Sequence, residues 1–98
     1  MAHFMVDIAL PADPTEEFIS LIPRQRAQVE KLLEQGTVVS YSLSLDRTRL
    51  WIILHAKHQR EAMEILATFP MFPWFDVSLH PLMFHNTSMI PLLKVSMN

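Results

Sequence analysis

One segment of nine residues, 69–77, limits the folds that this chain can adopt. Its sequence, FPMFPWFDV, combines two prolines, four aromatic residues and one aspartate. The interior of a strand does not tolerate two prolines, because proline lacks the N–H group that a sheet hydrogen bond needs. We therefore predict a rigid corner that ends a helix and leads into a strand, with Asp76 placed just inside that strand.

The rest of the chain alternates between strand and helix patterns. The predicted elements are a strand at 3–10, a helical region from 13 to 35 that Pro23 divides, with its longer piece at 24–35, strands at 37–45 and 50–55, a helix at 59–69 and a strand at 74–82. Asp13 is predicted to cap the first helix, since Pro14 suits the first helical position and Glu16 completes a capping box. The β-α-β-β-α-β order is that of a ferredoxin-like α+β fold with a four-stranded antiparallel sheet.

The second and third predicted strands in chain order differ in the residues that their two faces carry. The strand at 37–45 alternates serine with apolar residues, so that Val39 and Tyr41 are predicted to share its apolar face. The strand at 50–55 is apolar on both faces, which is typical of a sheet that is covered on both sides. Two helices cover only one face of such a sheet. We therefore predict a homodimer with the sheets packed together, and an apolar tail at 86–98 that helps to seal the join.

Composition narrows the class of protein. The 98 residues suffice for one domain, predicted as a core at 1–85 followed by the tail, and half of them are hydrophobic. Eight basic against ten acidic residues give a net charge of −2, which argues against a nucleic-acid partner. No apolar stretch approaches the roughly 20 residues that span a bilayer, and the first ten residues lack the features of a signal peptide. We therefore expect a soluble cytoplasmic protein without a membrane partner.

The residue types that are scarce also exclude several kinds of site. The chain has no cysteine, so disulfides, thiol catalysis and cysteine-ligated metals are excluded. Its single glycine, Gly36, rules out glycine-rich phosphate-binding loops. We predict no cofactor and no metal, and a ligand, if there is one, that side chains hold.

Strand alternation brings several polar residues to the predicted dimer side of the sheet. These are His3 and Asp7 in the first strand and Trp74, Asp76, Ser78 and His80 in the last. The first and last strands are neighbours in this topology, so we expect these side chains to converge. A carboxylate on an apolar surface has a raised pKa and can act as a general base, with a histidine to carry the proton onward. Structural networks perturb pKa values too, and spacing alone favours a purely structural role.

Three further features each have two interpretations. His55 and His58 lie close together and could bind a metal, although solvated histidines are the commoner use of such a pair. Four arginines could clamp a carboxylate substrate or simply be solvated: Arg24, Arg26, Arg47 and Arg49. The seven methionines could line a ligand cavity or fill gaps in the core.

At the corner and beyond it, the chain resembles the muconolactone isomerase family. The matching residues are Pro70, Phe72, Pro73, Trp74, Asp76, Val77, Leu82 and His85, preceded by His3, Leu10-Pro11, Asp13-Pro14 and Gln35-Gly36-Thr37. The similarity extends to Ser88, and the Pro-x-Phe-Pro-aromatic-x-Asp string is its specific part. The chain departs from the family at Ser78 and His80, where the isomerases are more acidic, and at Met5 and Asp7, where their first strand carries lysine.

The resemblance implies a fold, an assembly and a reaction. The fold is a dimeric α+β barrel of two ferredoxin-like halves, often assembled into larger rings. The reaction is a cofactor-free proton shift that moves a carbon–carbon double bond within an unsaturated lactone during aromatic degradation. Asp76, His85 and His3 are then the predicted catalytic residues, with Asp7, Trp74, Ser78 and His80 in contact with the substrate. A small-molecule binder without catalysis and a pure oligomerisation module are the alternatives.

Overall fold

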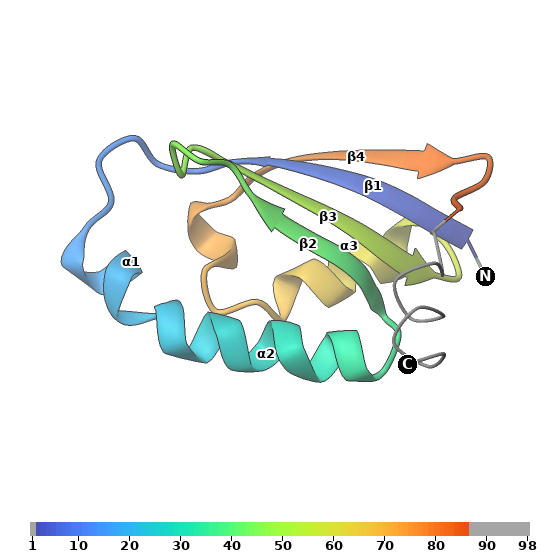
Figure 1. Ribbon diagram of the computed structural model, residues 1–98, viewed down its shortest axis with the longest axis horizontal. Coiled ribbons are helices and arrows are strands. Elements are labelled where there is room, and N and C mark those ends of the chain that lie inside the picture. Colours follow the sequence, from blue (N-terminus) through green and yellow to red (C-terminus); the bar gives the residue numbers. More distant parts are fainter. Residues whose placement is uncertain (1, 87–98) are drawn as a thin grey trace, which may run out of the picture.

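The helices of the described residues lie on one side of a four-stranded sheet (Figure 1). The computed structural model describes residues 2–86. In chain order its elements are β1 (Ala2–Ala9), α1 (Glu16–Ser20), α2 (Ile22–Glu34), β2 (Val38–Leu43), β3 (Arg49–Ala56), α3 (Gln59–Ala67), the short 3₁₀ helix η1 (Phe72–Trp74) and β4 (Asp76–Leu82). The predicted α+β class and β-α-β-β-α-β order are confirmed.

The strands of the sheet lie in the order β2-β3-β1-β4, and each neighbouring pair is antiparallel. The centre of the sheet is therefore formed by β1 and β3, as the ferredoxin-like pattern requires. Val6 of β1, for example, lies opposite Ile52 of β3 on one side and Leu79 of β4 on the other. The face of the sheet that is turned away from the helices is called the open sheet face below.

The hydrophobic core fills the space between the sheet and the helices. Alternate residues of β1 form its centre: Phe4, Val6 and Ile8 are 3%, 0% and 0% exposed. The other buried members are Val29, Leu32, Val38, Leu50, Ile52, Leu54, Ala56, Ala62, Leu66 and Phe69. Because successive strand residues point to opposite faces, this burial also determines which residues of β1, β3 and β4 lie on the open sheet face.

The first helical region is divided as predicted but begins at a different cap. Thr15, and not Asp13, caps α1: its Oγ1 accepts a hydrogen bond of 3.1 Å from the backbone N–H of Phe18. The prediction of Asp13 was wrong because the chain becomes helical two residues later, where the threonine hydroxyl can reach a free N–H. Pro23 stands in the first turn of α2, where its missing N–H costs no helical hydrogen bond.

A β-bulge makes β2 differ from the regular alternation of its sequence. The register of β2 with β3 shifts between Val38 and Ser40, so that Val39 is an extra residue. Val38 therefore faces the core at 1% exposure, on the same side as Tyr41. The prediction that Val39 shares the face of Tyr41 was wrong, because a bulge changes the face of every residue on one side of it.

The proline-aromatic corner joins α3 to β4 as predicted, and Asp76 is the first residue of β4. The strand begins later than expected, however, because Pro73 favours a helical φ angle and the chain forms η1. The N–H of Phe75 closes this turn by donating to the carbonyl oxygen of Phe72 at 2.9 Å. Trp74 thus belongs to η1, and its predicted place in the last strand beside Asp76 was wrong.

The predicted tail at 86–98 lies outside the described residues, apart from Asn86. Its role in sealing a dimer, and the division of the chain into a core and a tail, stay predictions. Among residues 2–86 no helix is both long enough and apolar enough to cross a membrane.

Candidate functional site

Most of the predicted site residues lie on the open sheet face. They are His3 and Asp7 of β1 and Asp76, Ser78 and His80 of β4. Each of them alternates along its strand with a residue that packs toward the helices. Asp7 and Ser78 are direct neighbours across the two strands. Strand alternation alone therefore predicted the correct face for these five residues.

The same residues are spread along the sheet and do not converge on one point. Asp76 lies opposite Ala9 at one end of β1, whereas His3 lies opposite Leu82 at the other end. The two positions are six residues apart along β1, which is roughly 20 Å at about 3.3 Å per residue. His85 lies beside His3. Within one chain, Asp76 and the pair His3 and His85 are therefore too far apart to act on the same small substrate.

Three histidines gather at the end of the sheet that is remote from Asp76. The rings of His3 and His55 stack with centroids 4.7 Å apart, and His85 lies 5.5 Å from His3 at a tilt of 46°. Partial burial lowers the pKa of His3 below its ordinary value of 6.5, and the charges of His55 and His85 lower it further. The cluster therefore favours an uncharged His3.

Acidification is expected to destabilise the protein through His3. The pKa of His3 is lower in the folded protein than in the unfolded chain, where it is about 6.5. Just below pH 6.5, the folded protein therefore binds fewer protons than the unfolded chain, and its stability falls as the pH drops. The melting temperature should fall less between about pH 8 and about pH 5 in a His3→Gln variant than in the unmodified protein. Equal falls in the two proteins would contradict a lowered pKa of His3 in the folded protein.

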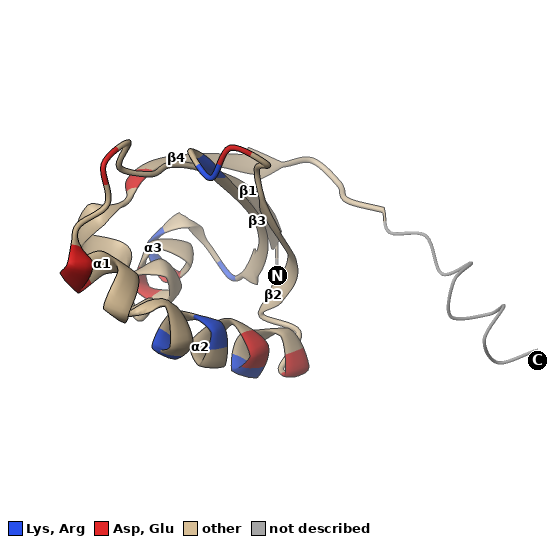
Figure 2. Ribbon diagram, turned by 60° about the vertical axis from the view of Figure 1, so that its left-hand side comes forward, with Lys and Arg blue, Asp and Glu red and all other residues tan. Residues whose placement is uncertain are grey.

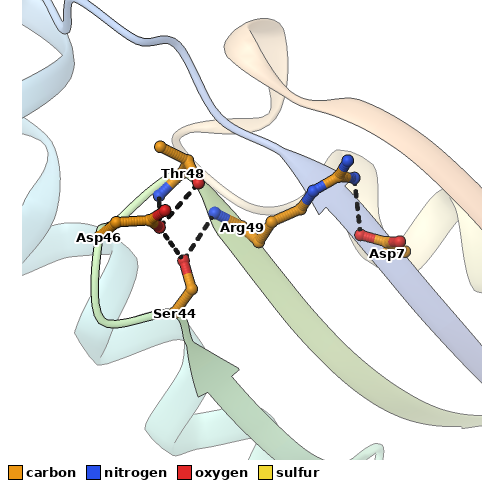
Figure 3. A network of polar contacts seen from close by, with 5 residues as sticks. All are labelled: Asp7, Ser44, Asp46, Thr48 and Arg49. Carbon is orange, nitrogen blue, oxygen red and sulfur yellow. Dashed lines mark hydrogen bonds and ion pairs between the residues drawn. The ribbon is translucent and has the colours of Figure 1, made fainter.

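The carboxylate of Asp7 is paired with an arginine. Arg49 of β3 donates from Nη1 to Asp7 Oδ1 at 3.1 Å, across the surface of the sheet (Figure 3). Side-chain exposures of 51% for Arg49 and 36% for Asp7 leave the pair in contact with solvent. The contact therefore occupies one carboxylate oxygen of Asp7 and balances its charge with that of an arginine.

Local packing gives structural contacts to two further residues, Trp74 and His58. Trp74 packs edge-on against Phe18 of α1, with ring centroids 5.7 Å apart, so it supports the helices and not the open sheet face. His58 caps α3, because its Nδ1 accepts a hydrogen bond of 3.2 Å from the N–H of Glu61. Within residues 2–86, no group of three or more histidine or acidic side chains could hold a metal ion.

A pocket of about 550 Å³ opens on the helix side of the sheet, at the same end as Asp76. Its walls come from the loop between β1 and α1, from α1, the start of α2, β2, the β2–β3 turn and the corner. The lining residues are Leu10, Pro11, Ala12, Pro14, Phe18, Ile19, Ile22, Gln25, Arg26, Tyr41, Leu43, Asp46, Arg47, Thr48, Leu50, Met71 and Phe75. The volume lies within the range that small-molecule sites occupy.

The corner contributes to this pocket through the neighbours of Asp76 and not through Asp76 itself. Met71 and Phe75 are both among the lining residues. Asp76 follows Phe75 directly, and because adjacent residues of an extended chain point in opposite directions, its carboxylate lies on the open sheet face. None of the seven predicted site residues lines the pocket.

The polar groups of the pocket include one buried amide. Gln25 of α2 is 3% exposed, and its Oε1 accepts a hydrogen bond of 3.2 Å from the backbone N–H of Met71. Its Nε2 donates to the hydroxyl oxygen of Tyr41 at 3.4 Å. Burial raises the pKa of Tyr41 above its ordinary value of 10.0, while this hydrogen bond and the charge of Arg26 act in the opposite direction. The tyrosine is therefore protonated at neutral pH.

The charged groups of the pocket are two arginines and one aspartate. Arg26 and Arg47 carry two positive charges, against the single negative charge of Asp46. Figure 2 shows the charged residues along α2 and at the β2–β3 turn, the two elements that contribute these groups. Asp46 is held by hydroxyl donors from Thr48 and Ser44 at 2.7 Å each and by the N–H of Thr48 at 3.0 Å (Figure 3). These hydrogen bonds lower the pKa of Asp46, and the lining has a net charge that suits an anion.

The sequence patterns did not indicate Gln25 and Tyr41 as residues of a site. Gln25 precedes Val29 and Leu32 at spacings of four and seven, so it continues the buried stripe of α2. A glutamine in an apolar stripe is a signal that could have identified it, since a buried amide needs hydrogen-bond partners. Tyr41 has no comparable signal, because an aromatic residue on the apolar face of a strand is ordinary core.

The sequence profile of the muconolactone delta-isomerase family matches residues 3–88 of the chain. A crystal structure of muconolactone isomerase has a similar fold, with a TM-score of 0.70 over 89% of this chain and 94% of that one, at 19% sequence identity. A search of curated protein sequences found no match. At this level of identity the structural likeness extends to the fold alone.

Proposed function

Because the chain belongs to the muconolactone delta-isomerase family, we propose that it catalyses a cofactor-free proton shift in a small unsaturated lactone or related acid. The observation that carries the proposal is the pocket of about 550 Å³ between the sheet and the helices. It combines apolar walls with a small number of polar groups, as small-molecule sites do. In line with the family, we propose a cytoplasmic enzyme that takes part in the breakdown of aromatic compounds.

The reaction needs two kinds of group around the substrate, a base and an electrophile. A base removes a proton from a carbon next to the carbonyl group, an electrophile stabilises the negative charge that moves to the carbonyl oxygen, and the proton returns to a different carbon. The substrate and product have the same atoms, so no oxidant or cofactor takes part. Arg26 and Arg47 are suited to hold a carboxylate of the substrate at the mouth of the pocket.

The chain offers several candidates for the base, on two faces of the sheet. Asp46 is the carboxylate of the pocket lining. Asp76, His85 and His3 stay candidates for a reaction on the open sheet face, where a second subunit would have to complete the site. The two placements are separable by experiment, because they assign the substrate to opposite faces of the sheet.

A small-molecule binder without catalysis is the second candidate function. The observation that favours it is the hydrogen bonding of Asp46, which lowers its pKa and so makes it a weak base at neutral pH. Saturable binding of muconolactone without its conversion to an isomer would support the binder. Incorporation at the rate of turnover would support the isomerase.

We also propose that two chains pair through the open sheet face. Trp51 of β3 is 40% exposed on this face, next to Asp7, and Ile53 follows it two residues later on the same side. A large aromatic residue on a sheet face that no helix of residues 2–86 covers is the kind of anchor that protein interfaces use. The same pairing would bring the predicted residues Ser78 and His80 into an interface.

Exchange of substrate protons with heavy water, followed by magnetic resonance, separates the two placements of the site. For the pocket, Arg26→Ala should raise the KM for muconolactone by roughly tenfold or more through loss of a charged hydrogen bond. Arg24→Ala is the matched control, because Arg24 is an exposed arginine of the same helix outside the pocket lining. Asp76→Ala should retain exchange. Loss of exchange in Asp76→Ala with normal dimerisation, and an unaffected Arg26→Ala, would assign the reaction to the open sheet face.

A further inference from the structure

The buried amide of Gln25 connects three separate parts of the pocket wall. It projects from α2, contacts the corner at Met71 and contacts β2 at Tyr41. Among residues 2–86, Gln25 is the one polar residue that is buried. Gln25, Met71 and Tyr41 all line the pocket. A buried amide at such a junction has a fixed orientation, because both of its ends must be satisfied.

The orientation of the amide follows from its contact with the corner. The backbone N–H of Met71 can only donate, so the Gln25 atom that accepts its hydrogen bond at 3.2 Å has to be the oxygen Oε1. The NH₂ group of Gln25 is then directed to Tyr41, whose hydroxyl oxygen lies 3.4 Å from Nε2. Since an amide NH₂ group can only donate, the hydroxyl of Tyr41 is the acceptor in this contact.

This arrangement leaves the hydroxyl proton of Tyr41 available for a ligand. A phenol has one proton to donate. Within residues 2–86, the hydroxyl of Tyr41 takes part in one hydrogen bond, in which it accepts from Gln25. The proton therefore has no protein acceptor in the described part of the chain, and the residue lines the pocket.

We propose that Tyr41 donates its hydroxyl proton in a hydrogen bond to the carbonyl oxygen of a bound lactone, and that Gln25 is the positioning residue that directs it. This inference rests on the proposed function for the choice of ligand, a small lactone. In the proton shift, the same hydrogen bond strengthens as negative charge moves to the carbonyl oxygen. Tyr41 is then the electrophilic group, and the family-specific corner acts through Met71 by holding Gln25 in place.

Two substitutions separate the donor from the residue that directs it. Tyr41→Phe removes the hydroxyl alone. Gln25→Glu keeps an acceptor for the N–H of Met71 but offers Tyr41 a carboxylate, so the hydroxyl proton turns toward position 25 and away from the pocket. Gln28→Glu is the matched control: it makes the same change of charge on the same helix, where Gln28 donates to Thr68 at an exposed position.

Binding is measured with γ-butyrolactone, which is neutral and has no double bond to move, so the result does not depend on catalysis. We expect both Tyr41→Phe and Gln25→Glu to weaken its binding by roughly tenfold, while Gln28→Glu binds normally. Circular dichroism establishes that each variant is folded. Normal binding of γ-butyrolactone by either folded variant would overturn the proposal.

Tyr41 also supplies a spectroscopic test, because it is the single tyrosine of the chain. The absorbance of tyrosinate during an alkaline titration reports its pKa directly. Gln25→Glu should raise this pKa, since the carboxylate replaces a donor that favours the phenolate. An unchanged pKa would show that Gln25 does not contact the hydroxyl. Failure of the unmodified protein to exchange protons of muconolactone would instead refute the isomerase function and leave the binding and titration results to decide this proposal.

Discussion

Replacing Phe69 with alanine is expected to lower the free energy of unfolding by about 3–5 kcal/mol. Phe69 is 2% exposed and is among the largest fully buried side chains of the described residues. Its ring packs against Phe75 at a centroid distance of 6.3 Å, with an interplanar angle of 79°. The substitution would leave a cavity where the corner meets the core. Urea denaturation followed by circular dichroism gives the free energy directly.

Phe84→Ala is the control for this experiment. Phe84 is 73% exposed, so its removal should change the free energy of unfolding by no more than about 0.5 kcal/mol. Similar losses for the two variants would contradict the assignment of Phe69 to the core. A loss at Phe69 of less than about 1 kcal/mol would mean that the corner repacks freely and does not hold Phe75 and Met71 in the pocket wall.

The second large effect is expected at the open sheet face. Trp51→Ala should weaken self-association at least about 30-fold, which corresponds to about 2 kcal/mol, because tryptophan is enriched among the residues that contribute most to interface affinity. Sedimentation velocity over a range of concentrations measures the dissociation constant. The result rests on the proposed pairing of two sheets.

Leu33→Ala provides a control of matched exposure. Leu33 of α2 is 41% exposed and Trp51 is 40% exposed, but Leu33 lies on a helix and not on the open sheet face. Self-association should therefore be unchanged in Leu33→Ala. A protein that is monomeric at all concentrations, or one that dimerises equally well without Trp51, would contradict pairing through this face.

The order of elements in this fold was predictable because the periodicity of apolar residues differs between strands and helices. The errors are local and have local causes. The bulge at Val39 reverses the alternation of β2 without any mark in the sequence. The cap at Thr15 depends on where the backbone first becomes helical, and Pro14 is compatible with both Asp13 and Thr15 as the cap.

The candidate site was less predictable than the fold. Alternation gives the face on which a strand residue lies, which was correct for Asp7 and Asp76, but it does not give the distance between residues of two antiparallel strands. That distance depends on register, and the register places Asp76 and His3 at opposite ends of β1. The pocket depends on even longer-range contacts, since Gln25 and Met71 are separated by 46 residues and meet through a single hydrogen bond.

Titration of the protein with muconolactone, followed by the magnetic resonance signals of its aromatic side chains, determines whether the ligand binds in the pocket or on the open sheet face. The chain has one tyrosine and five histidines, so each candidate surface carries its own probe. A ligand in the pocket should shift the ring signals of Tyr41 with saturation and leave those of His3, His80 and His85 unchanged. Saturable shifts at these histidines without a shift at Tyr41 would place the ligand on the open sheet face and contradict binding in the pocket.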